Sequence, residues 1–200
     1  MNVKNNITLL ENLISQNNGR ITTKEASAAG IHRMYLKNMV DKGLLIQSSR
    51  GVYQSADSLE DELYNLQLKY SAGIYSFETA LYLHGFLERA PFSWTMTFKN
   101  SYHSESIKKE NIEVKYSLEK LYPLEIETIL TPGKNKVRTY SMERTLCEIL
   151  TTKAATDIQV ITYAFRTYAK RKDKNIPKLM ELSNIFHVTE KIRAYLEMLL

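Results

Sequence analysis

Residues 22–54 constrain the fold most strongly, because they contain the start, turn and stop signals of two consecutive helices. Thr22 and Glu25 fit a capping box, in which the Thr hydroxyl accepts a hydrogen bond from a first-turn amide and the Glu carboxylate reaches back to the cap residue. Gly30 permits a sharp turn, and Gly43 stands where a left-handed cap would end the second helix. The apolar positions of this second helix recur at helical spacing: Ile31, Leu36, Met39 and Val40. The stretch therefore predicts a helix-turn-helix.

Two short strands are predicted directly after the second helix. Residues 44–46 and 52–53 are apolar, and the polar stretch 48–51 joins them as a turn. A preceding amphipathic helix would supply the backing that such a unit needs. Its apolar face consists of Ile7, Leu10, Leu13 and Ile14. Together these elements predict a winged helix-turn-helix domain over residues 1–55.

The outward face of the second helix suits duplex DNA. In such units the second helix lies in the major groove, and its N-terminal residues reach the base edges. Arg33 could pair with guanine and Asn38 with adenine, whereas neighbouring Lys and Tyr side chains suit phosphates and Arg50 suits a minor groove or its backbone. The candidate DNA-binding residues are Thr23, Lys24, His32, Arg33, Met34, Tyr35, Lys37, Asn38, Lys42 and Arg50. The alternative is a winged helix that docks onto proteins.

The distribution of charge favours the DNA reading. The whole chain has 27 Lys+Arg, 22 Asp+Glu and a formal charge of +5. Residues 1–55 hold seven basic and three acidic side chains, a charge of +4, so the remaining 145 residues carry only +1. Nearly all the excess positive charge therefore lies on the predicted winged helix-turn-helix domain, as phosphate binding requires.

Residues 56–200 are predicted to form a second domain, and the chain as a whole belongs to the α+β class. The polar stretch 55–58 is the predicted boundary, and Ser58 is the predicted N-cap of a helix whose apolar positions begin at Leu59. A further helix is predicted from residue 75. Strand patterns follow at 94–98, 112–116, 124–130 and 137–140, and helix patterns at 142–150, 158–168, 177–186 and 189–200. This order predicts a small sheet with several helices around it.

No catalytic constellation is evident, and the chain is predicted not to be an enzyme. Glu125 and Glu127 would share one strand face; a solvated face is the simpler reading, and a metal-dependent nuclease site is the alternative. His84, at a predicted helix end, is expected to cap or pack rather than to bind a ligand. No histidine has a His or Cys partner at metal-ligand spacing, so neither a metal nor a cofactor is expected.

The protein is expected in the cytoplasm. Its single cysteine, Cys147, cannot form an internal disulfide, which fits a reducing compartment, and its apolar neighbours indicate a buried, inert thiol. No apolar run approaches the roughly 18 residues that a membrane-spanning helix needs, so no membrane partner is expected. The first residues also lack the apolar core of a signal peptide.

A second group of basic side chains lies towards the C-terminus. It could hold nucleic acid or an acidic partner, or it could complement the negative end of a helix dipole and be solvated. This possible second basic patch consists of Arg166, Lys170, Arg171, Lys172 and Lys174.

Two motifs of the second domain resemble a known family. The sequences YSFETALYLHG at residues 75–85 and TYSMERTLCEIL at residues 139–150, with Pro91 between them, are similar to the AbiEi family of antitoxins. The helix motif of that family usually has the form S-P-E-R-T-L-x-D. Ser141, Glu143, Arg144, Thr145 and Leu146 match it. Met142 stands in place of the Pro and Glu148 in place of the Asp, and both suit a helix.

The resemblance implies a specific function. AbiEi proteins are antitoxins of type IV toxin–antitoxin systems, encoded with a nucleotidyltransferase-like toxin and tied to abortive infection of phage-infected cells. Their N-terminal winged helix represses the operon at its promoter, commonly at inverted repeats, and their C-terminal domain is associated with countering the toxin without requiring a stable complex. A monomer, or a dimer formed on DNA, suits the half-sites of such repeats.

Alternatives remain for the motif and for the whole protein. Glu143, Arg144 and Thr145 could form an antitoxin surface, or they could be fold-forming, with Arg144 paired to Glu148 one helical turn away. The main alternative function is a small-molecule-responsive winged-helix regulator, which would need an apolar pocket in the second domain. A nuclease that uses the Glu125 and Glu127 region is the third hypothesis.

Overall fold

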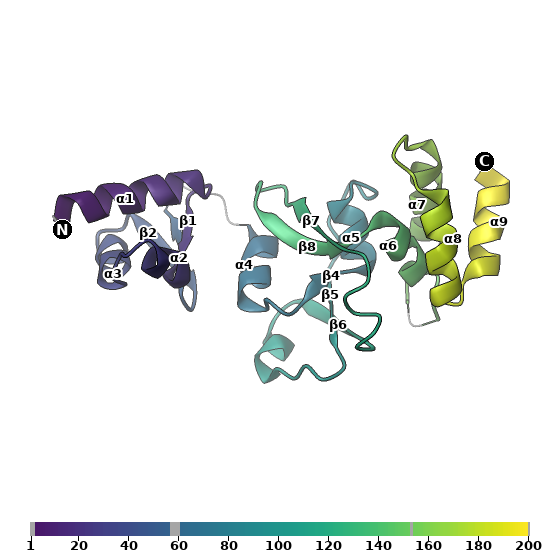
Figure 1. The fold of residues 1–200 in the computed structure, drawn as a ribbon, viewed down its shortest axis with the longest axis horizontal. Coiled ribbons are helices and arrows are strands. Elements are labelled where there is room, and N and C mark those ends of the chain that lie inside the picture. The colour runs from purple at the N-terminus through teal and green to yellow at the C-terminus, as the bar shows by residue number, and fades with distance from the viewer. Residues whose placement is uncertain (1–2, 57–60, 153, 200) are drawn as a thin grey trace. The chain divides into compact units, whose positions relative to one another are not determined.

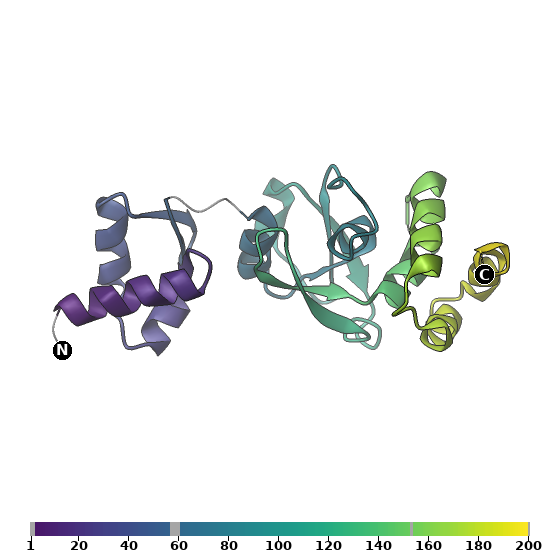
Figure 2. The ribbon, with the colours of Figure 1, turned by 90° about the horizontal axis from the view of Figure 1, so that it is seen from above.

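The computed structural model describes residues 3–56, 61–152 and 154–199. The chain forms two compact units. The first comprises Met1–Ser71 and Leu130–Lys136, and the second comprises Ala72–Ile129 and Val137–Leu200. Figures 1 and 2 show the elements of each unit from two directions. The predicted boundary stretch 55–58 lies partly outside the described residues, and the predicted cap Ser58 and first apolar position Leu59 lie wholly outside them.

The first unit contains the predicted winged helix-turn-helix. Its elements are α1 (Val3–Gln16), β1 (Arg20–Thr22), α2 (Thr23–Ala28), α3 (Met34–Asp41), β2 (Leu45–Ser49), β3 (Val52–Ser55) and α4 (Glu62–Lys69). The strands form an antiparallel sheet in the order β1-β3-β2. The sequence analysis did not predict β1, which pairs residue by residue with β3 and widens the ribbon to three strands.

Local sequence signals produce the helix-turn-helix as expected. The Thr22 hydroxyl accepts a hydrogen bond from the Glu25 amide at 3.1 Å, and the Glu25 carboxylate accepts one from the Thr22 amide at 2.7 Å. Gly30 and Gly43 both have the positive φ that their turns require, +75° and +70°. After α3, the Leu44 amide donates to the Met39 carbonyl at 2.9 Å, which satisfies a free carbonyl at the helix end.

One apolar core joins the helices and strands of the winged helix. Its buried residues come from α1, β1, α2, α3, β2 and the turn before α3: Leu10, Ile14, Ile21, Ala26, Ile31, Leu36, Met39 and Leu45. Because α3 packs its inner face into this core, its opposite face is fixed towards solvent.

A buried polar cluster lies around the start of α4. Asp61 is the N-cap of this helix and accepts a hydrogen bond from the Tyr64 amide at 3.1 Å. Its Oδ2 atom also accepts bonds from the Thr131 hydroxyl and from Asn135 Nδ2, and Arg20 Nη1 lies 3.7 Å from it. Asp61 therefore fixes residues that are far apart in the chain within the first unit.

The second unit combines a five-stranded mixed sheet with helices. Its strands are β4 (Ile74–Tyr75), β5 (Trp94–Lys99), β6 (Ile112–Ser117), β7 (Ile126–Leu130) and β8 (Lys136–Tyr140), with the order β6-β5-β4-β8-β7. Its helices are α5 (Phe77–Leu83), η1 (Glu105–Lys109), α6 (Met142–Ile149), α7 (Ile158–Lys170), α8 (Ile176–Ile185) and α9 (Thr189–Leu199). Strands β4 and β5 are antiparallel, whereas the pairs β4–β8 and β5–β6 are parallel.

The predicted α+β class is confirmed, and the predicted helices and strands of the second domain recur with small shifts at their ends. The two-residue strand β4 was missed, although it joins β5 to β8 at the centre of the sheet. The strand expected from residue 124 begins at Ile126, because Glu125 has a positive φ of 54° that breaks the extended run. Helix α6 is buried from Glu143 to Ile149 and forms the centre of the unit.

Candidate nucleic-acid interface

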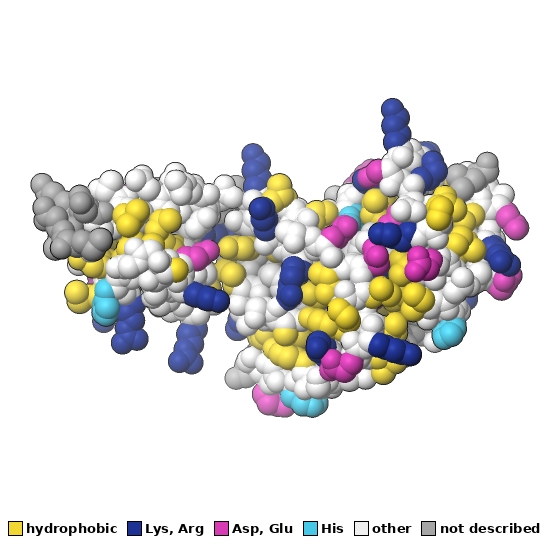
Figure 3. Space-filling model, in the orientation of Figure 1, with side chains coloured by type: hydrophobic (Ala, Val, Ile, Leu, Met, Phe, Trp, Pro, Cys, Tyr) yellow, Lys and Arg dark blue, Asp and Glu magenta, His cyan; other side chains and the backbone are white. Residues whose placement is uncertain are grey.

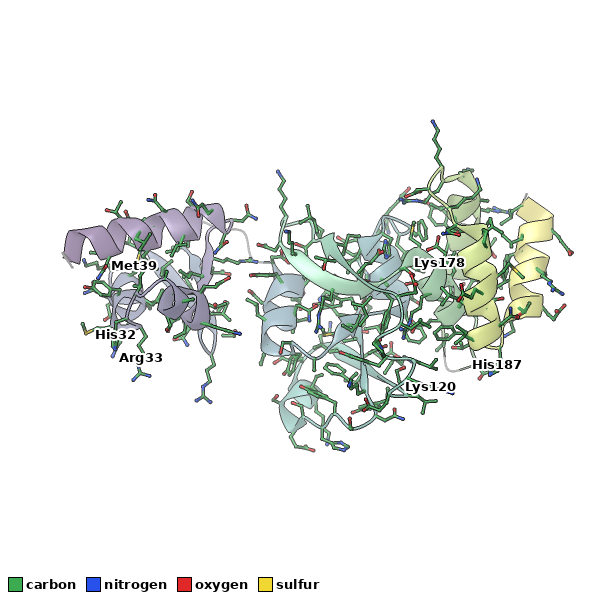
Figure 4. The ribbon with its side chains drawn as sticks, viewed as in Figure 1. His32, Arg33, Met39, Lys120, Lys178 and His187 are labelled. Atoms are coloured by element: carbon green, nitrogen blue, oxygen red, sulfur yellow. The ribbon has the colours of Figure 1, made fainter. Side chains whose placement is uncertain are left out.

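The N-terminus of α3 presents three exposed side chains in succession. His32, Arg33 and Met34 are all exposed, and Met34 keeps 64% of its surface accessible. The Met34 amide donates to His32 Nδ1 at 3.3 Å. Because Nδ1 accepts this bond, the neutral ring carries its proton on Nε2, which is a donor. Figure 4 shows the side chains of His32 and Arg33 extending away from the start of α3.

The rest of the outward face of α3 is polar and accessible. Lys37 and Asn38 are exposed along the helix, and Lys42 is exposed at its C-cap, whereas Leu36 and Met39 are buried on the opposite face. The side chains of Arg33, Lys37 and Asn38 are all exposed to solvent. The face therefore combines cations with an amide that can both donate and accept, as base-edge and phosphate recognition requires.

The wing is held against the start of α2. Arg50 is exposed at the turn between β2 and β3, next to Gly51, whose φ is +77°. The amide and the hydroxyl of Thr23 both donate to the Gly51 carbonyl, at 2.8 and 3.2 Å. Thr23 thereby positions the wing turn that carries Arg50, while Lys24 stays exposed beside it. Figure 3 shows basic side chains projecting from one edge of this unit, beside a histidine.

Two basic or polar residues of the first unit have structural contacts that the sequence did not reveal. Tyr35 is half-buried against the core, and its hydroxyl accepts a hydrogen bond from Asn6 Nδ2 at 3.3 Å. Arg20, which contributes to the basic excess of residues 1–55, is only 2% exposed, lies near Asp61 and stacks 5.4 Å above the Tyr64 ring. The positive charge that DNA could reach is therefore smaller than the count of basic residues suggests.

The motif residues of the second unit are buried. Glu143, Arg144 and Thr145 are 5, 0 and 0% exposed, so they form no surface for a toxin, and that alternative is corrected in favour of a fold-forming role. Arg144 Nε and Nη2 donate to Glu148 Oε1 at 3.1 and 3.0 Å, which is the expected pair. The guanidinium also donates to the carbonyls of Leu121 and Leu124 and so holds this turn against α6.

Glu143 has a similar structural role. Its Oε1 atom accepts hydrogen bonds from the Tyr168 hydroxyl at 2.9 Å and from the Asn175 amide at 3.1 Å. It therefore connects α6 to α7 and to the start of α8. Cys147 is also buried on α6. Burial raises the pKa of its thiol to about 12, so the thiol stays protonated and unreactive at neutral pH.

The possible second basic patch does not form one uniform cationic surface. Arg166, Lys170 and Lys172 are exposed, but Arg171 forms a two-point ion pair with Asp173, at 2.7 and 2.8 Å. Arg171 also donates to the His84 carbonyl, and Lys174 donates to the Arg171 carbonyl. Two of the five side chains are thus tied to the fold, and an acidic residue lies among them.

The residues considered for a nuclease or metal site are engaged with other groups. Lys178 Nζ donates to Glu125 at 2.8 Å, and His84 Nε2 lies 2.8 Å from the Tyr140 carbonyl and 3.3 Å from Glu127. His84 is also the C-cap of α5, as its position in the sequence indicated. Among the residues that the structure describes, no group of three or more His, Cys, Asp or Glu is arranged to hold a metal ion.

The helix-turn-helix and the wing lie within a segment that matches a known protein family. Residues 9–56 match the family described as "Transcriptional regulator, AbiEi antitoxin". This N-terminal segment is similar to that family. The resemblance to AbiEi antitoxins is thereby confirmed for the N-terminal domain, and the α3 face and the wing lie within the matched residues. For the motifs at residues 75–85 and 139–150 the resemblance stays a prediction.

A solved structure resembles this chain beyond the N-terminal segment. The RV2827C protein from Mycobacterium tuberculosis is similar with a TM-score of 0.52 and 14% sequence identity, over 87% of this chain and 71% of that one. At this identity the likeness concerns the fold alone. No curated protein matches the chain. Within the described ranges, every helix is too short or too polar to span a bilayer.

Proposed function

We propose that the protein is an antitoxin and autorepressor that binds inverted repeats in its own promoter through the winged helix. The observation that carries the DNA-binding half is the accessible α3 face, on which Arg33, Lys37 and Asn38 are exposed while the core fixes the helix from behind. The AbiEi-type match of residues 9–56 supports a regulatory role. One protein molecule per half-site, with pairing on DNA, suits an inverted repeat.

The residues would divide the work of recognition by their chemistry. Arg33, at the start of α3, would donate to guanine, and Asn38 would both donate to and accept from adenine. Lys24, Lys37 and Lys42 would neutralise phosphates, and Arg50 on the wing would reach the minor groove or its backbone. His32, with its Nε2–H directed outward by the bond at Nδ1, adds a donor beside Arg33.

Promoter binding by matched variants tests this assignment. We expect Arg33→Ala and Asn38→Ala each to weaken binding to the upstream duplex by about 1–3 kcal/mol, and to weaken binding to a shuffled duplex much less. Lys37→Ala and Lys42→Ala should weaken both duplexes alike, and Lys108→Ala, at an exposed lysine of the second unit outside both basic surfaces, is the control. Normal promoter binding by the Arg33 and Asn38 variants would show that another surface reads the DNA.

The antitoxin half of the proposal needs its own experiment. The second unit is proposed to counter a nucleotidyltransferase-like toxin, with or without direct contact, as the AbiEi resemblance implies. Co-expression with the product of a neighbouring nucleotidyltransferase gene should restore growth, and Arg33→Ala should keep this effect because it alters only the DNA face. Failure of the wild-type chain to restore growth would refute the antitoxin role while leaving the promoter-binding result unaffected.

A small-molecule-responsive regulator is the alternative, and one observation favours it. The second unit has a cavity of about 780 Å³ with apolar side chains in its walls, which is the feature that hypothesis requires. Such a regulator would change its promoter affinity when the ligand is bound. Promoter titrations with and without a ligand of the cavity distinguish the two functions.

A further inference from the structure

A cavity of the second unit lies among β6, the turn that follows it, the end of α6 and the junction of α8 with α9. Its volume is about 780 Å³, within the range of roughly 300–1,000 Å³ that is common for small-molecule sites. All of its lining residues belong to the second unit. Lys120 and His187, which both line it, are labelled in Figure 4.

Aromatic and aliphatic side chains form part of the wall. Phe77 and Phe186 contribute rings, and Leu118, Ile185 and Val188 contribute aliphatic surface. Leu118 and Ile185 are exposed, 52 and 37%, so this apolar surface is accessible. Such walls favour a ligand with a flat ring, since ring faces pack well against both kinds of side chain.

Positive charge surrounds these apolar walls. Lys120 and Lys191 line the cavity, and neither forms an ion pair within the described residues, although Lys191 Nζ donates to the Leu150 carbonyl at 2.8 Å. Lys115 also lines it but is paired with Glu113 at 2.8 Å. The one acidic residue in the lining, Glu148, is paired with Arg144. The uncompensated charge of the cavity is therefore positive, and it favours an anion.

The lining also holds groups that suit the polar edge of a ring or a sugar. Ser117, Thr151 and Thr152 supply hydroxyls, which both donate and accept. Glu148 also lines the cavity, and its Oε2 atom is buried without a hydrogen-bond partner among the described residues.

Two residues of the lining adopt an unusual backbone conformation. Phe77 has a φ of +51° and His187 a φ of +56°, the left-handed region that side chains other than glycine rarely occupy. Both residues lie at the ends of helices that border the cavity. His187 is the left-handed residue that ends α8, where the Val188 amide donates to the Ser183 carbonyl at 2.9 Å.

We propose that this cavity binds an aromatic anion of the size of a nucleoside monophosphate. The ring would pack against Phe77 and Phe186, its polar edge would face the hydroxyls, and the phosphate would bind Lys120 and Lys191. The site goes beyond the proposed repressor function, because every lining residue lies outside the winged helix.

Calorimetric titration of the full chain tests the site with defined probes. The probes are the four ribonucleoside monophosphates, their nucleosides, and ribose 5-phosphate. We expect at least one monophosphate to bind more tightly than both its nucleoside and ribose 5-phosphate, since only the monophosphate occupies the walls and the cations together. Absence of binding by all four monophosphates at millimolar concentration would overturn the proposal.

Variants locate the binding. Lys120→Ala should weaken the monophosphate about five- to tenfold and leave the nucleoside unchanged, since it removes one charged contact, and Leu118→Trp, at an exposed position, should block the cavity. Lys172→Ala and Arg33→Ala are the controls, and each variant is checked by its thermal melting. Binding that survives Leu118→Trp, or that is lost in Arg33→Ala, would place the nucleotide elsewhere and overturn the proposal, whatever the promoter experiments show.

Discussion

Replacement of Arg144 by Met should destabilise the second unit severely. The guanidinium has no exposed surface, donates twice to Glu148 Oε1, donates to the carbonyls of Leu121 and Leu124, and lies 3.2 Å above the Tyr140 ring. Methionine keeps much of the apolar volume but leaves Glu148 buried without its cation. Breaking a buried ion pair costs about 3–5 kcal/mol, and each partly buried carbonyl that loses its donor adds about 1 kcal/mol.

The expected loss is therefore at least about 4 kcal/mol, a large part of the roughly 5–15 kcal/mol that stabilises a typical domain. Urea unfolding at neutral pH measures it, and Trp94, the single tryptophan of the chain, reports on the second unit because it lies at the start of β5. The matched control is Arg193→Met, which removes the exposed pair of Arg193 with Glu190 and should cost about 1 kcal/mol or less.

The double variant Arg144→Met/Glu148→Gln separates the charge from the hydrogen bonds. Gln removes the uncompensated carboxylate, so the double variant should be more stable than Arg144→Met alone, although the Leu121 and Leu124 carbonyls still lack their donor. If Arg144→Met costs no more than Arg193→Met, the buried pair does not hold α6 in place, and the fold-forming role assigned to the motif is wrong.

Three further predictions concern salt, alkaline pH and a close backbone contact. Promoter affinity should fall with salt with a log–log slope of about −3.6 per molecule if four exposed cations neutralise phosphates, and a slope near zero in filter binding would contradict this. Burial raises the pKa of Cys147 to about 12 and also raises the pKa values of Tyr140 and Tyr168. The contribution of these groups to stability is therefore complete below their unfolded pKa values and is lost as pH rises beyond them. The urea midpoint measured by circular dichroism should fall above about pH 9, and a constant midpoint up to pH 11 would refute the assignment. Gly133→Ala would place Cβ 2.5 Å from Asp61 Oδ2 and should lower the stability of the first unit by about 1–3 kcal/mol; a thermal melt unchanged from that of the wild-type chain would argue against this contact.

The features that were predicted from the sequence depend on interactions between residues that are close together in the chain. The capping box of Thr22 and Glu25, the left-handed Gly30 and Gly43, and the apolar spacing of α3 each depend on neighbours within about one or two helical turns. These signals determine which face of α3 is buried, so they also determine which side chains face solvent. That is why the exposure of Arg33 and Asn38 could be predicted before the structure was known.

The features that were missed depend on residues far apart in the chain. Strand β1 exists because Arg20–Thr22 pairs with β3, and three residues without alternation give no strand signal of their own. The charge of Arg20 is offset by Asp61, and the wing turn is held by Thr23 through the Gly51 carbonyl. The cavity likewise combines β6, α6 and the junction of α8 with α9, which no local pattern brings together.

The candidate DNA-binding residues and the motif residues of α6 differ in their exposure to solvent. Side chains that read DNA must be accessible, and Arg33 and Asn38 are exposed on a helix that the core holds in place. Glu143, Arg144 and Thr145 are enclosed, so their side chains cannot meet a partner while the second unit stays folded. Any contact with a toxin must then use residues outside that motif, and substitutions in it would abolish antitoxin action only by unfolding the unit. A variant such as Arg144→Met that lost antitoxin action with an unchanged urea midpoint would therefore contradict both the buried position and the fold-forming role.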